Sequence, residues 1–408
     1  MTSTCTDART KIALSKESNG IAMREQTLDD VVMSAWLPLI VFTILFLSAA
    51  QGDEPAVDYI FPAGGQRGTS VEFRVGGYNL HDRCSFEMWG DGVAASDHLV
   101  RAPQTVWFEG PLLRLPQSQG RQDYPKDQIG RVQIDADAAL GWKRWRVWTS
   151  QGATPSRPFV VGELPEMVEV EIDGRPVPTE IHLPVTINGR IFPRQDTDIW
   201  TFSAQAGETY YCEVLAERIG SPLDSRLVVI GPDGETVAEN LDHFGNDSSV
   251  WFTASTTGNY AVEIQDVRFD GEQHFVYRLT IRNGPYVQSA FPLGGQRGTA
   301  IEFQLYGGGV PDTPMLLDLP LQSPAPFAMG VEIEGRLTNR FRLQLSDVPE
   351  TVEREPNNHT ENALPVSVPG VGNGCISRPG DTDWWSVSLK QGEIVEFDLD
   401  AASLGSRL

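Results

Sequence analysis

Short stretches of the chain alternate apolar and polar residues with a period of two, which is the pattern of half-buried β-strands. These stretches are rich in β-branched and aromatic residues, and turn sequences such as Gly231-Pro-Asp-Gly234 separate them. The clearest examples are residues 197–203, 209–215, 226–230, 259–264 and 274–281. No segment between Asp53 and Leu408 sustains the period of about 3.6 residues that marks an amphipathic helix. The pattern predicts an all-β chain of tandem β-sandwiches, Ig-like and jelly-roll-like.

Two motifs occur twice, which divides the chain into repeated units. FPAGGQRGTSVEF at residues 61–73 returns as FPLGGQRGTAIEF at residues 291–303, an offset of 291 − 61 = 230. DTDIW at residues 196–200 returns as DTDWW at residues 381–385, an offset of 381 − 196 = 185. We therefore expect an A-B-A-B array behind an N-terminal extension and signal segment (1–52). Its four units are A1 (53–163), B1 (164–283), A2 (284–348) and B2 (349–408).

The two offsets differ by 230 − 185 = 45, so A2 should be about 45 residues shorter than A1. Leu408 aligns with Leu223, whereas B1 continues to residue 283. The sequence therefore predicts a truncated, incomplete B2. Such a unit should have unpaired strand edges and exposed apolar side chains such as Trp384 or Trp385.

Residues 36–50 (WLPLIVFTILFLSAA) form an uncharged apolar run followed by small residues. The run is shorter than the roughly 20 residues that span a bilayer, but it suits a secretory signal cleaved after Ala50 or Gly52. We therefore expect a secreted, cell-surface or periplasmic protein with no membrane span beyond this segment. The alternative is an uncleaved N-terminal membrane anchor. Translation from Met23 or Met33 would give a more typical signal.

Composition narrows the function further. The chain has 32 Lys plus Arg against 55 Asp plus Glu, a net charge of −23, so nucleic acid is not an expected partner. The cysteines lack the close spacing of a thiolate metal site or a redox motif. We expect buried or incidental thiols rather than a disulfide framework at Cys5, Cys84, Cys212 and Cys375.

No catalytic residues are expected. Gly68-Thr69-Ser70 is similar to the sequence around a subtilisin-type nucleophile, but the equivalent of Ser70 in the repeat is Ala300, and Ser70 should open a strand. The six histidines show no His-Glu-x-x-His spacing, which argues against a zinc hydrolase. The glycine-rich residues 370–374 (GVGNG) lack the lysine and helix of a phosphate loop, so we expect a turn there.

Both units resemble known bacterial modules. The A unit, with its FPxGGQRGT opening, resembles the IPT/TIG-type Ig-like domains of large secreted proteins, especially planctomycete ones. The B unit resembles the pre-peptidase C-terminal domain through Asp196-x-Asp198 before an aromatic strand, the stretch GSPLD at residues 220–224, and the GPDG turn. The resemblance implies a non-catalytic sandwich attached to exported enzymes, often proteases.

Calcium is the cofactor that the resemblance and the residues together suggest. Some pre-peptidase C-terminal domains, notably collagen-binding ones, are similar in placing a Glu/Asn/Asp-rich segment and an Asp-rich turn around calcium, which prefers hard oxygen ligands. The alternative is a solvated linker whose Asp side chains cap the turn. B1 keeps Asp196 and Asp198 but lacks the Glu-Pro-Asn-Asn segment, so calcium is expected less there. The candidate ligands in B2 are Glu355, Asn357, Asn358, Asp381 and Asp383.

Three tryptophans, Trp142, Trp145 and Trp148, could form a platform for stacking sugars. In a strand, Trp145 would lie on the opposite face from Arg144, Arg146 and Trp148, so core packing should account for at least one of the three tryptophans.

The main hypothesis is therefore an exported, non-catalytic array of β-sandwich modules that acts as a cell-surface spacer or binding module. The first alternative is the N-terminal accessory region of a larger secreted hydrolase, a protease, whose catalytic domain lies outside this chain. The second is an adhesion module for a cell-surface polysaccharide or matrix protein.

Overall fold

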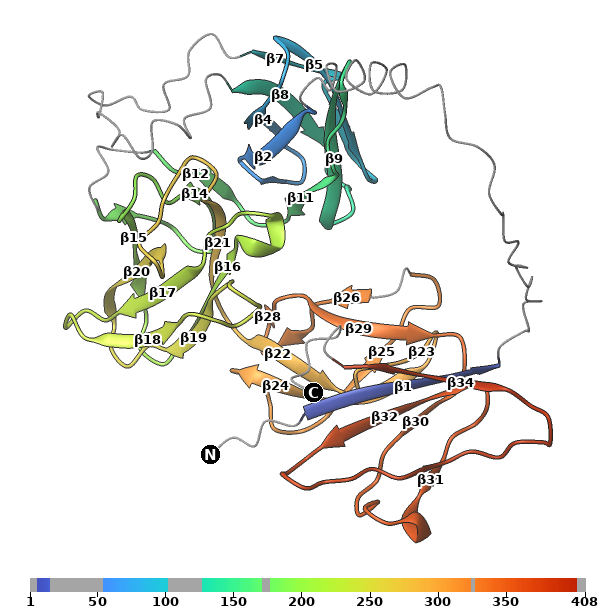
Figure 1. Ribbon diagram of the computed structural model, residues 1–408. Coiled ribbons are helices and arrows are strands. Elements are labelled where there is room, and N and C mark those ends of the chain that lie inside the picture. Colours follow the sequence, from blue (N-terminus) through green and yellow to red (C-terminus); the bar gives the residue numbers. More distant parts are fainter. Residues whose placement is uncertain (1–5, 15–53, 102–126, 171–176, 324–326, 402–408) are drawn as a thin grey trace, which may run out of the picture. The chain divides into compact units, whose positions relative to one another are not determined.

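The computed structural model describes residues 6–14, 54–101, 127–170, 177–323 and 327–401 (Figure 1). These residues form strands joined by turns and two single-turn 3₁₀ helices, η1 (Glu217–Ile219) and η2 (Thr360–Asn362). The all-β prediction is therefore confirmed. The chain divides into two compact units, residues 30–283 and residues 1–29 with 284–408. No helix in the described part of the chain is long and apolar enough to cross a membrane. The apolar run 36–50 lies outside the described residues.

Unit A1 is built on a ten-stranded sheet. The main path runs β2-β4-β8-β7-β5-β9-β11-β3, with β10 on β9 and β6 on β8. Strands β2 and β3 lie at opposite ends of this order although two residues separate them in sequence, so the sheet folds over on itself around its core. The strands are β2 (Ala56–Phe61), β3 (Gly64–Gln66), β4 (Ser70–Tyr78), β5 (Arg83–Trp89), β6 (Val93–Ala95), β7 (His98–Arg101), β8 (Gln128–Ile134), β9 (Gly141–Thr149), β10 (Gly152–Ala153) and β11 (Arg157–Gly162).

Unit B1 is a sandwich of two five-stranded sheets. The first has the order β12 (Glu166–Val168), β14 (Val185–Arg190), β21 (Val276–Asn283), β16 (Thr209–Leu215) and β19 (Ser249–Thr253). The second has the order β13 (Thr179–Glu180), β15 (Thr197–Ala204), β20 (Gly258–Asp266), β17 (Ser225–Ile230) and β18 (Thr236–Asn240). One core takes Ile187, Val214 and Leu279 from the first sheet and Phe202 and Val262 from the second. The period-two pattern is the alternation of these inward residues with outward polar ones.

Unit A2 is a smaller version with two three-stranded sheets and one hairpin. The first sheet contains β22 (Tyr286–Phe291), β24 (Ala300–Gly308) and β25 (Met315–Asp318). The second contains β23 (Gly294–Gln296), β29 (Phe341–Ser346) and β26 (Phe327–Met329), and β27 (Glu332–Ile333) pairs with β28 (Arg336–Leu337). Ser70 opens β4 as predicted, and its equivalent Ala300 opens β24 at the same point of the repeat.

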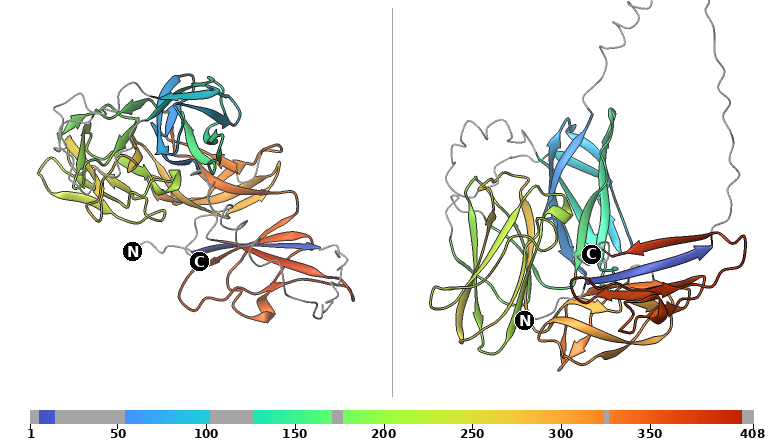
Figure 2. Two further views of the ribbon diagram at one scale, coloured as in Figure 1. Left: turned by 45° about the horizontal axis from the view of Figure 1, so that its top comes forward. Right: turned by 60° about the horizontal axis from the view of Figure 1, so that its bottom comes forward.

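Unit B2 contains a four-stranded sheet in the order β30 (Glu350–Val352), β32 (Gly370–Ile376), β1 (Thr6–Leu14) and β34 (Val395–Asp400). Figures 1 and 2 show the blue strand β1 beside the red strands β32 and β34 in every view. A short second layer pairs β31 (Leu364–Pro365) with β33 (Trp385–Ser386). Trp384, Phe397 and Leu399 are 42%, 58% and 58% exposed, and the exposure of Trp384 was expected. The four-stranded sheet was not expected, because one of its strands, β1, comes from the N-terminal extension.

The prediction of a turn at residues 370–374 is wrong, because these residues lie in the buried strand β32. Glycine in a strand interior often marks a close approach of other groups, and that is its role here. A Cβ atom at Gly372 would lie 3.3 Å from the Trp385 ring, and one at Gly374 would lie 2.9 Å from Asp383 Oδ2. The glycines make room for the groups packed against β32.

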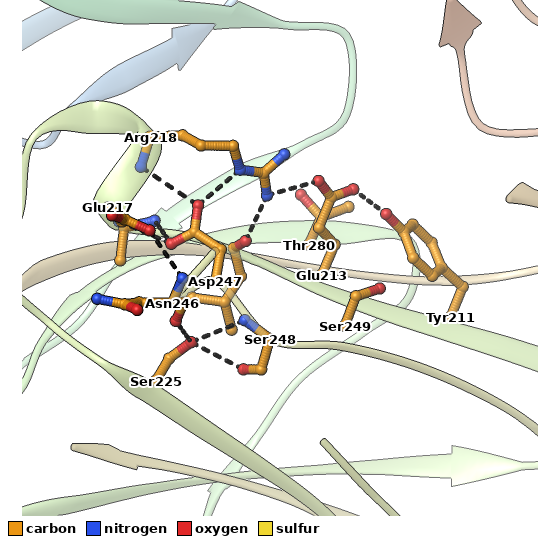
Figure 3. A network of polar contacts seen from close by, with 12 residues as sticks. Tyr211, Glu213, Glu217, Arg218, Ser225, Asn246, Asp247, Ser248, Ser249 and Thr280 are labelled. Carbon is orange, nitrogen blue, oxygen red and sulfur yellow. Dashed lines mark hydrogen bonds and ion pairs between the residues drawn. The ribbon is translucent and has the colours of Figure 1, made fainter. Parts of the chain in front are cut away.

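A polar network inside B1 fixes η1 to a distant loop (Figure 3). The side chain of Asp247 is fully buried and accepts hydrogen bonds from the backbone N–H groups of Ala216 (2.8 Å) and Glu217 (2.7 Å). Arg218 Nε donates to Asp247 Oδ2 at 2.6 Å, and Arg218 Nη2 donates to Glu213 Oε1 at 2.9 Å. Each buried charge therefore has a charged partner and further hydrogen bonds, which makes this a structural network.

Replacing Asp247 by alanine should destabilise B1 strongly, because the Arg218 guanidinium and three backbone donors would lose a buried acceptor. We expect a loss on the order of 3–5 kcal/mol in urea unfolding. The control Asp242→Ala removes an exposed carboxylate five residues away and should cost at most about 0.5 kcal/mol. Equal effects of the two substitutions would contradict this account of the network.

Candidate functional site

Two loops of B2 meet beside β32. The first loop follows β30, where Glu353 N–H donates to Asn373 O of β32 at 2.9 Å. The second follows β32 and contains Asp381 and Asp383. Trp384 N–H donates to Asn357 O at 3.1 Å, which ties the two loops together. The geometry thus brings acidic residues from two separate segments to one place.

Carboxylate oxygens of Glu355, Asp381 and Asp383 lie within 4.8 Å of one another. Asn357 is completely buried at their side. Three buried oxygens have no hydrogen-bond partner: Asn357 Oδ1, Asp381 Oδ1 and Asp383 Oδ1. A buried acceptor without a donor is costly, so a group of three in one place needs a cationic or donor partner.

The pKa values of the cluster also indicate that its carboxylates lack a positively charged partner. Burial, together with the neighbouring Asp383, raises the pKa of Glu353 to about 8. Burial also raises the pKa of Asp383, although Glu353 and Asn357 donate hydrogen bonds to its carboxylate. Asp381 differs, because hydrogen bonds from Ser377 N–H (2.7 Å) and Ser377 Oγ–H (2.8 Å) lower its pKa. The cluster therefore contains one stably charged carboxylate beside two acids whose charge is unfavourable without a cation.

Four of the five candidate ligands in B2 converge: Glu355, Asn357, Asp381 and Asp383. The fifth, Asn358, lies beside them, because its side chain hydrogen-bonds with Asp381 and its Oδ1 accepts a hydrogen bond from Thr382 N–H at 2.9 Å. Sequence reasoning omitted Glu353 from the ligand set, although its side chain hydrogen-bonds with Asp383. The residues present offer only oxygen donors, which is the donor set that suits calcium.

Unit B1 repeats the backbone arrangement of this site. Glu169 N–H donates to Asn188 O at 2.9 Å, as Glu353 does to Asn373, and Arg190 N–H donates to Glu169 Oε2 at 2.8 Å. Asp196 accepts hydrogen bonds from Phe192 N–H (3.1 Å) and Thr197 N–H (2.9 Å), as Asp381 does from Ser377. The candidates Asp196 and Asp198 are therefore brought together with Glu169, a residue outside the predicted ligand set.

The two sites differ in what faces the carboxylates. In B1 the guanidinium of Arg190 is buried, with 2% of the residue exposed. Burial raises the pKa of Glu169 and of Asp196, and the positive charge of Arg190 opposes that rise. Tyr277 OH donates to Asp198 Oδ2 at 2.7 Å. An offset of 185 places Cys375 at the position of Arg190, so the described residues of B2 have a cysteine instead of an arginine at this position. B1 thus carries an internal positive charge where B2 leaves oxygens unpartnered.

The expectation of four unpaired cysteines is wrong for Cys375, which is disulfide-bonded. Cys84 and Cys212 are buried free thiols, and burial raises the pKa of each. A raised thiol pKa lowers the fraction of nucleophilic thiolate, so neither position favours covalent catalysis.

The three tryptophans lie on opposite faces of β9, as their spacing predicts. Trp145 is completely buried, and its Nε1–H donates to Pro158 O at 3.0 Å. Trp142 is 41% exposed and Trp148 is half-buried on the outer face of β9. Trp89 of β5, which sequence reasoning missed, is 38% exposed, and Arg146 lies 5.4 Å from its ring and 4.4 Å from that of Trp148. The outer face of β5 and β9 therefore carries aromatic rings and the ion pair of Arg146 with Glu87, whose Nη2–Oε2 distance is 3.2 Å.

No protein-family model matches the chain, and no curated protein matches it in sequence. Among solved structures, it is similar to the pre-peptidase C-terminal domain of a collagenase from Bacillus anthracis, at 20% identity over 26% of this chain and 97% of that one, with a TM-score of 0.22. PliG, a periplasmic lysozyme inhibitor from Aeromonas hydrophila, is similar at 17% identity over 29% and 99%, with a TM-score of 0.22. SGBP-B from the mixed-linkage glucan utilization locus of Bacteroides ovatus is similar at 8% identity over 52% and 74%, with a TM-score of 0.17.

The acid cluster of B1 should make this unit less stable as the pH rises. Burial raises the pKa of Glu169 to about 7 and that of Asp196 to about 6 in the folded state, whereas both return to ordinary values on unfolding. The folded state therefore binds more protons between about pH 4 and pH 7, and stability falls as the pH rises through this window.

The change can be followed as amide exchange protection of β14 and β21 at pH 5 and pH 7.5. One carboxyl contributes at most about 1.4 kcal/mol per pH unit, and Glu169→Gln should flatten the dependence because the amide does not titrate. Protection that rises with pH, or that falls equally in Glu169→Gln, would show that these groups do not control it.

Proposed function

We propose that the chain is an exported, non-catalytic array of β-sandwich modules, a cell-surface spacer or binding module in which B2 holds a calcium ion. The observation that carries the calcium assignment is the group of three buried, unpartnered oxygens on Asn357, Asp381 and Asp383. A cation among them would supply the partner that each oxygen lacks. Arg190 supplies a positive charge at the equivalent place in B1, which supports the need for one in B2.

The donor set favours calcium over other metals. Zinc and copper favour imidazole and thiolate ligands, and the cluster is composed of carboxylates and an amide. Calcium takes six to eight oxygens in a flexible geometry, whereas magnesium demands a near-ideal octahedron and retains waters. Glu355, Asp381, Asp383 and Asn357 would supply four or more oxygens, with water completing the shell.

Calcium bound here would have a structural role. It would join the loop after β30 to the loop after β32 and remove the repulsion between Glu353 and Asp383. A module stiffened in this way suits a spacer in a calcium-containing extracellular medium. The same role fits the alternative in which the chain is the accessory region of a larger secreted hydrolase.

The aromatic face of A1 supports a second candidate, adhesion to a polysaccharide. Tryptophan rings exposed on a flat sheet can stack on the apolar faces of sugar rings, and the guanidinium of Arg146 beside Trp89 and Trp148 can donate hydrogen bonds to hydroxyl groups. Apolar side chains gathered on one exposed face often mark an interaction site.

Calcium should bind to the full-length chain with a stoichiometry near one in isothermal titration calorimetry. It should also raise the melting temperature, because a ligand that binds only the folded state stabilises it, by about 2.7 kcal/mol at one hundred times the dissociation constant. Asp381→Asn should abolish both effects. Asp196→Asn is the matched control at the equivalent position of B1 and should leave calcium binding unchanged.

Absence of calcium binding to the parent chain would remove the calcium proposal. Equal loss in Asp381→Asn and Asp196→Asn would place the ion elsewhere. Magnesium at the same concentration should give a smaller shift in melting temperature.

The adhesion candidate predicts that the full-length chain co-sediments with at least one insoluble polysaccharide from a panel of cellulose, chitin, mixed-linkage glucan and peptidoglycan. The double substitution of Trp89 and Trp148 by alanine should weaken that binding by at least about tenfold, since stacking contributes about 1 kcal/mol or more per ring. Trp384→Ala, which removes an exposed tryptophan of B2, should have no effect. A parent chain that binds none of the four polymers would eliminate this candidate.

A further inference from the structure

The repeated FPxGGQRGT motif contributes neither to the acid cluster nor to the aromatic face, and in A1 it lies against the connection to B1. A1 and B1 belong to one compact unit, and only residues 163–165 separate β11 of A1 from β12 of B1. Arg67 N–H of the motif donates to Gly162 O at the end of β11 at 2.9 Å. The equivalent Arg297 N–H of A2 donates to Ser346 O at 3.0 Å. The motif therefore holds the start of the connection in both repeats.

The second glycine of the motif serves packing inside each A unit. A Cβ atom at Gly65 would lie 2.5 Å from Val71 Cγ2. A Cβ atom at Gly295, the equivalent residue of A2, would collide with Ile301, which is the equivalent of Val71. Because the two repeats agree, the requirement for glycine at this position comes from the A unit alone.

The first glycine of the motif faces B1. A Cβ atom at Gly64 would collide with the guanidinium of Arg278, which belongs to β21 of B1, and with Val160 O of the paired strand β11. Arg278 is 4% exposed and is held in place, since its Nη2 donates to Glu166 Oε1 at 2.7 Å and its Nη1 to Asn188 Oδ1 at 2.8 Å. Only a residue without a side chain lets the backbone of β3 approach this buried guanidinium.

Side chains also pack across the boundary between A1 and B1. Ile219 of η1 and Val276 of β21 are 6% and 3% exposed, and they belong to the hydrophobic core cluster of A1 rather than to that of B1. The ring of Phe61, the first residue of the motif, lies 5.7 Å from Cζ of Arg190 in B1. Unfolding of either unit would therefore expose apolar surface that the other unit covers.

Arg157 of β11 connects the backbones of the two units. Its Nη1 donates to Asp58 O of A1 at 2.6 Å, and its Nη2 donates to Gly220 O of B1 at 3.2 Å. Gly220 caps η1, so this guanidinium contacts the same turn that supplies Ile219 to the A1 core. The contact between A1 and B1 thus combines apolar burial with charged hydrogen bonds to backbone oxygens.

We propose that the FPxGGQRGT motif of A1 is a docking surface for the B unit that follows it, and that A1 and B1 form one rigid pair in which the stability of each unit depends on the other. The feature of the B unit that fits this surface is a buried arginine, Arg278, which the Glu166–Asn188 pair presents to the bare backbone at Gly64. The structural repeat of the array is then a pair of A and B units. The proposal does not depend on calcium or on the proposed function of the array.

The first test adds a methyl group to the motif in the full-length chain. Gly64→Ala should displace Arg278 from its buried acceptors, so the amides of β21 should exchange at least about tenfold faster than in the parent. Gly65→Ala is the matched control, because the same substitution one residue later collides only with side chains of A1. It should accelerate exchange in β4 and leave β21 within about threefold of the parent. Equal acceleration of β21 by the two substitutions would overturn the role of Gly64.

The second test changes each unit and measures the other, again in the full-length chain. Ile219→Ala removes apolar surface from a B1 residue, and amides of β3 and β11 in A1 should exchange at least about tenfold faster. Arg157→Gln changes an A1 residue, and amides of η1 and β21 in B1 should exchange at least about threefold faster, because Gly220 O loses a charged donor. Arg131→Gln, which removes an exposed arginine of A1 paired with Glu72, should leave exchange in B1 unchanged.

Acceleration on both sides of the boundary would support the rigid pair, because the free energy of a shared contact is lost whichever unit unfolds. Acceleration confined to the unit that carries the substitution would show that A1 and B1 are independent domains, and it would overturn the proposal. An equal response of B1 to Arg157→Gln and Arg131→Gln would likewise contradict a specific contact at Gly220.

Discussion

The central strand of the first B sheet is the constraint on which the B units depend. Strand β21 pairs on both edges, so its absence would leave two rows of backbone donors and acceptors and the buried Glu166–Asn188 pair without partners. In the second unit β1 meets the same requirement from the opposite end of the sequence. A sheet position of this kind is defined by its neighbours, and any segment with the right pattern can occupy it.

A second constraint is the set of carboxylates beside the same sheet. Folding brings Glu169, Asp196 and Asp198 together in B1 and Glu353, Asp381 and Asp383 together in B2. Burial raises the pKa of Glu169 and Asp196 in B1 and of Glu353 and Asp383 in B2, so the charged forms of these four acids are unfavourable. In B1 the positively charged side chain of Arg190 offsets the unfavourable charge of the buried carboxylates. B2 has Cys375 at that position and leaves acceptors open, so one scaffold uses two solutions to the same electrostatic problem.

The fold class followed from the sequence because period-two alternation and turn residues are local signals, and the repeats supplied the equivalent positions. The convergence of Asp381 and Asp383 with Glu355 followed from the short spacing within each loop. The hydrogen bond from Thr382 N–H to Asn358 Oδ1 could not be predicted from the sequence, because it depends on how the two loops close. Strand β1 had no local signal at all, since its partners lie more than 350 residues away. The role of Arg190 could have been found by asking what the repeat places at Cys375.

The two constraints meet in β32. Its outer edge receives β1, and the same strand bears the acid cluster through the backbone of Cys375, whose N–H hydrogen-bonds to Glu353. Gly374 lies between them, where any side chain would collide with the carboxylates of Asp383 and Glu353 at 2.9 Å and 3.2 Å. The position of the cluster is therefore only as well defined as the position of β32, and β32 is held in the sheet mainly by its long pairing with β1. The sheet and the candidate ion site of this unit are thus linked through one strand.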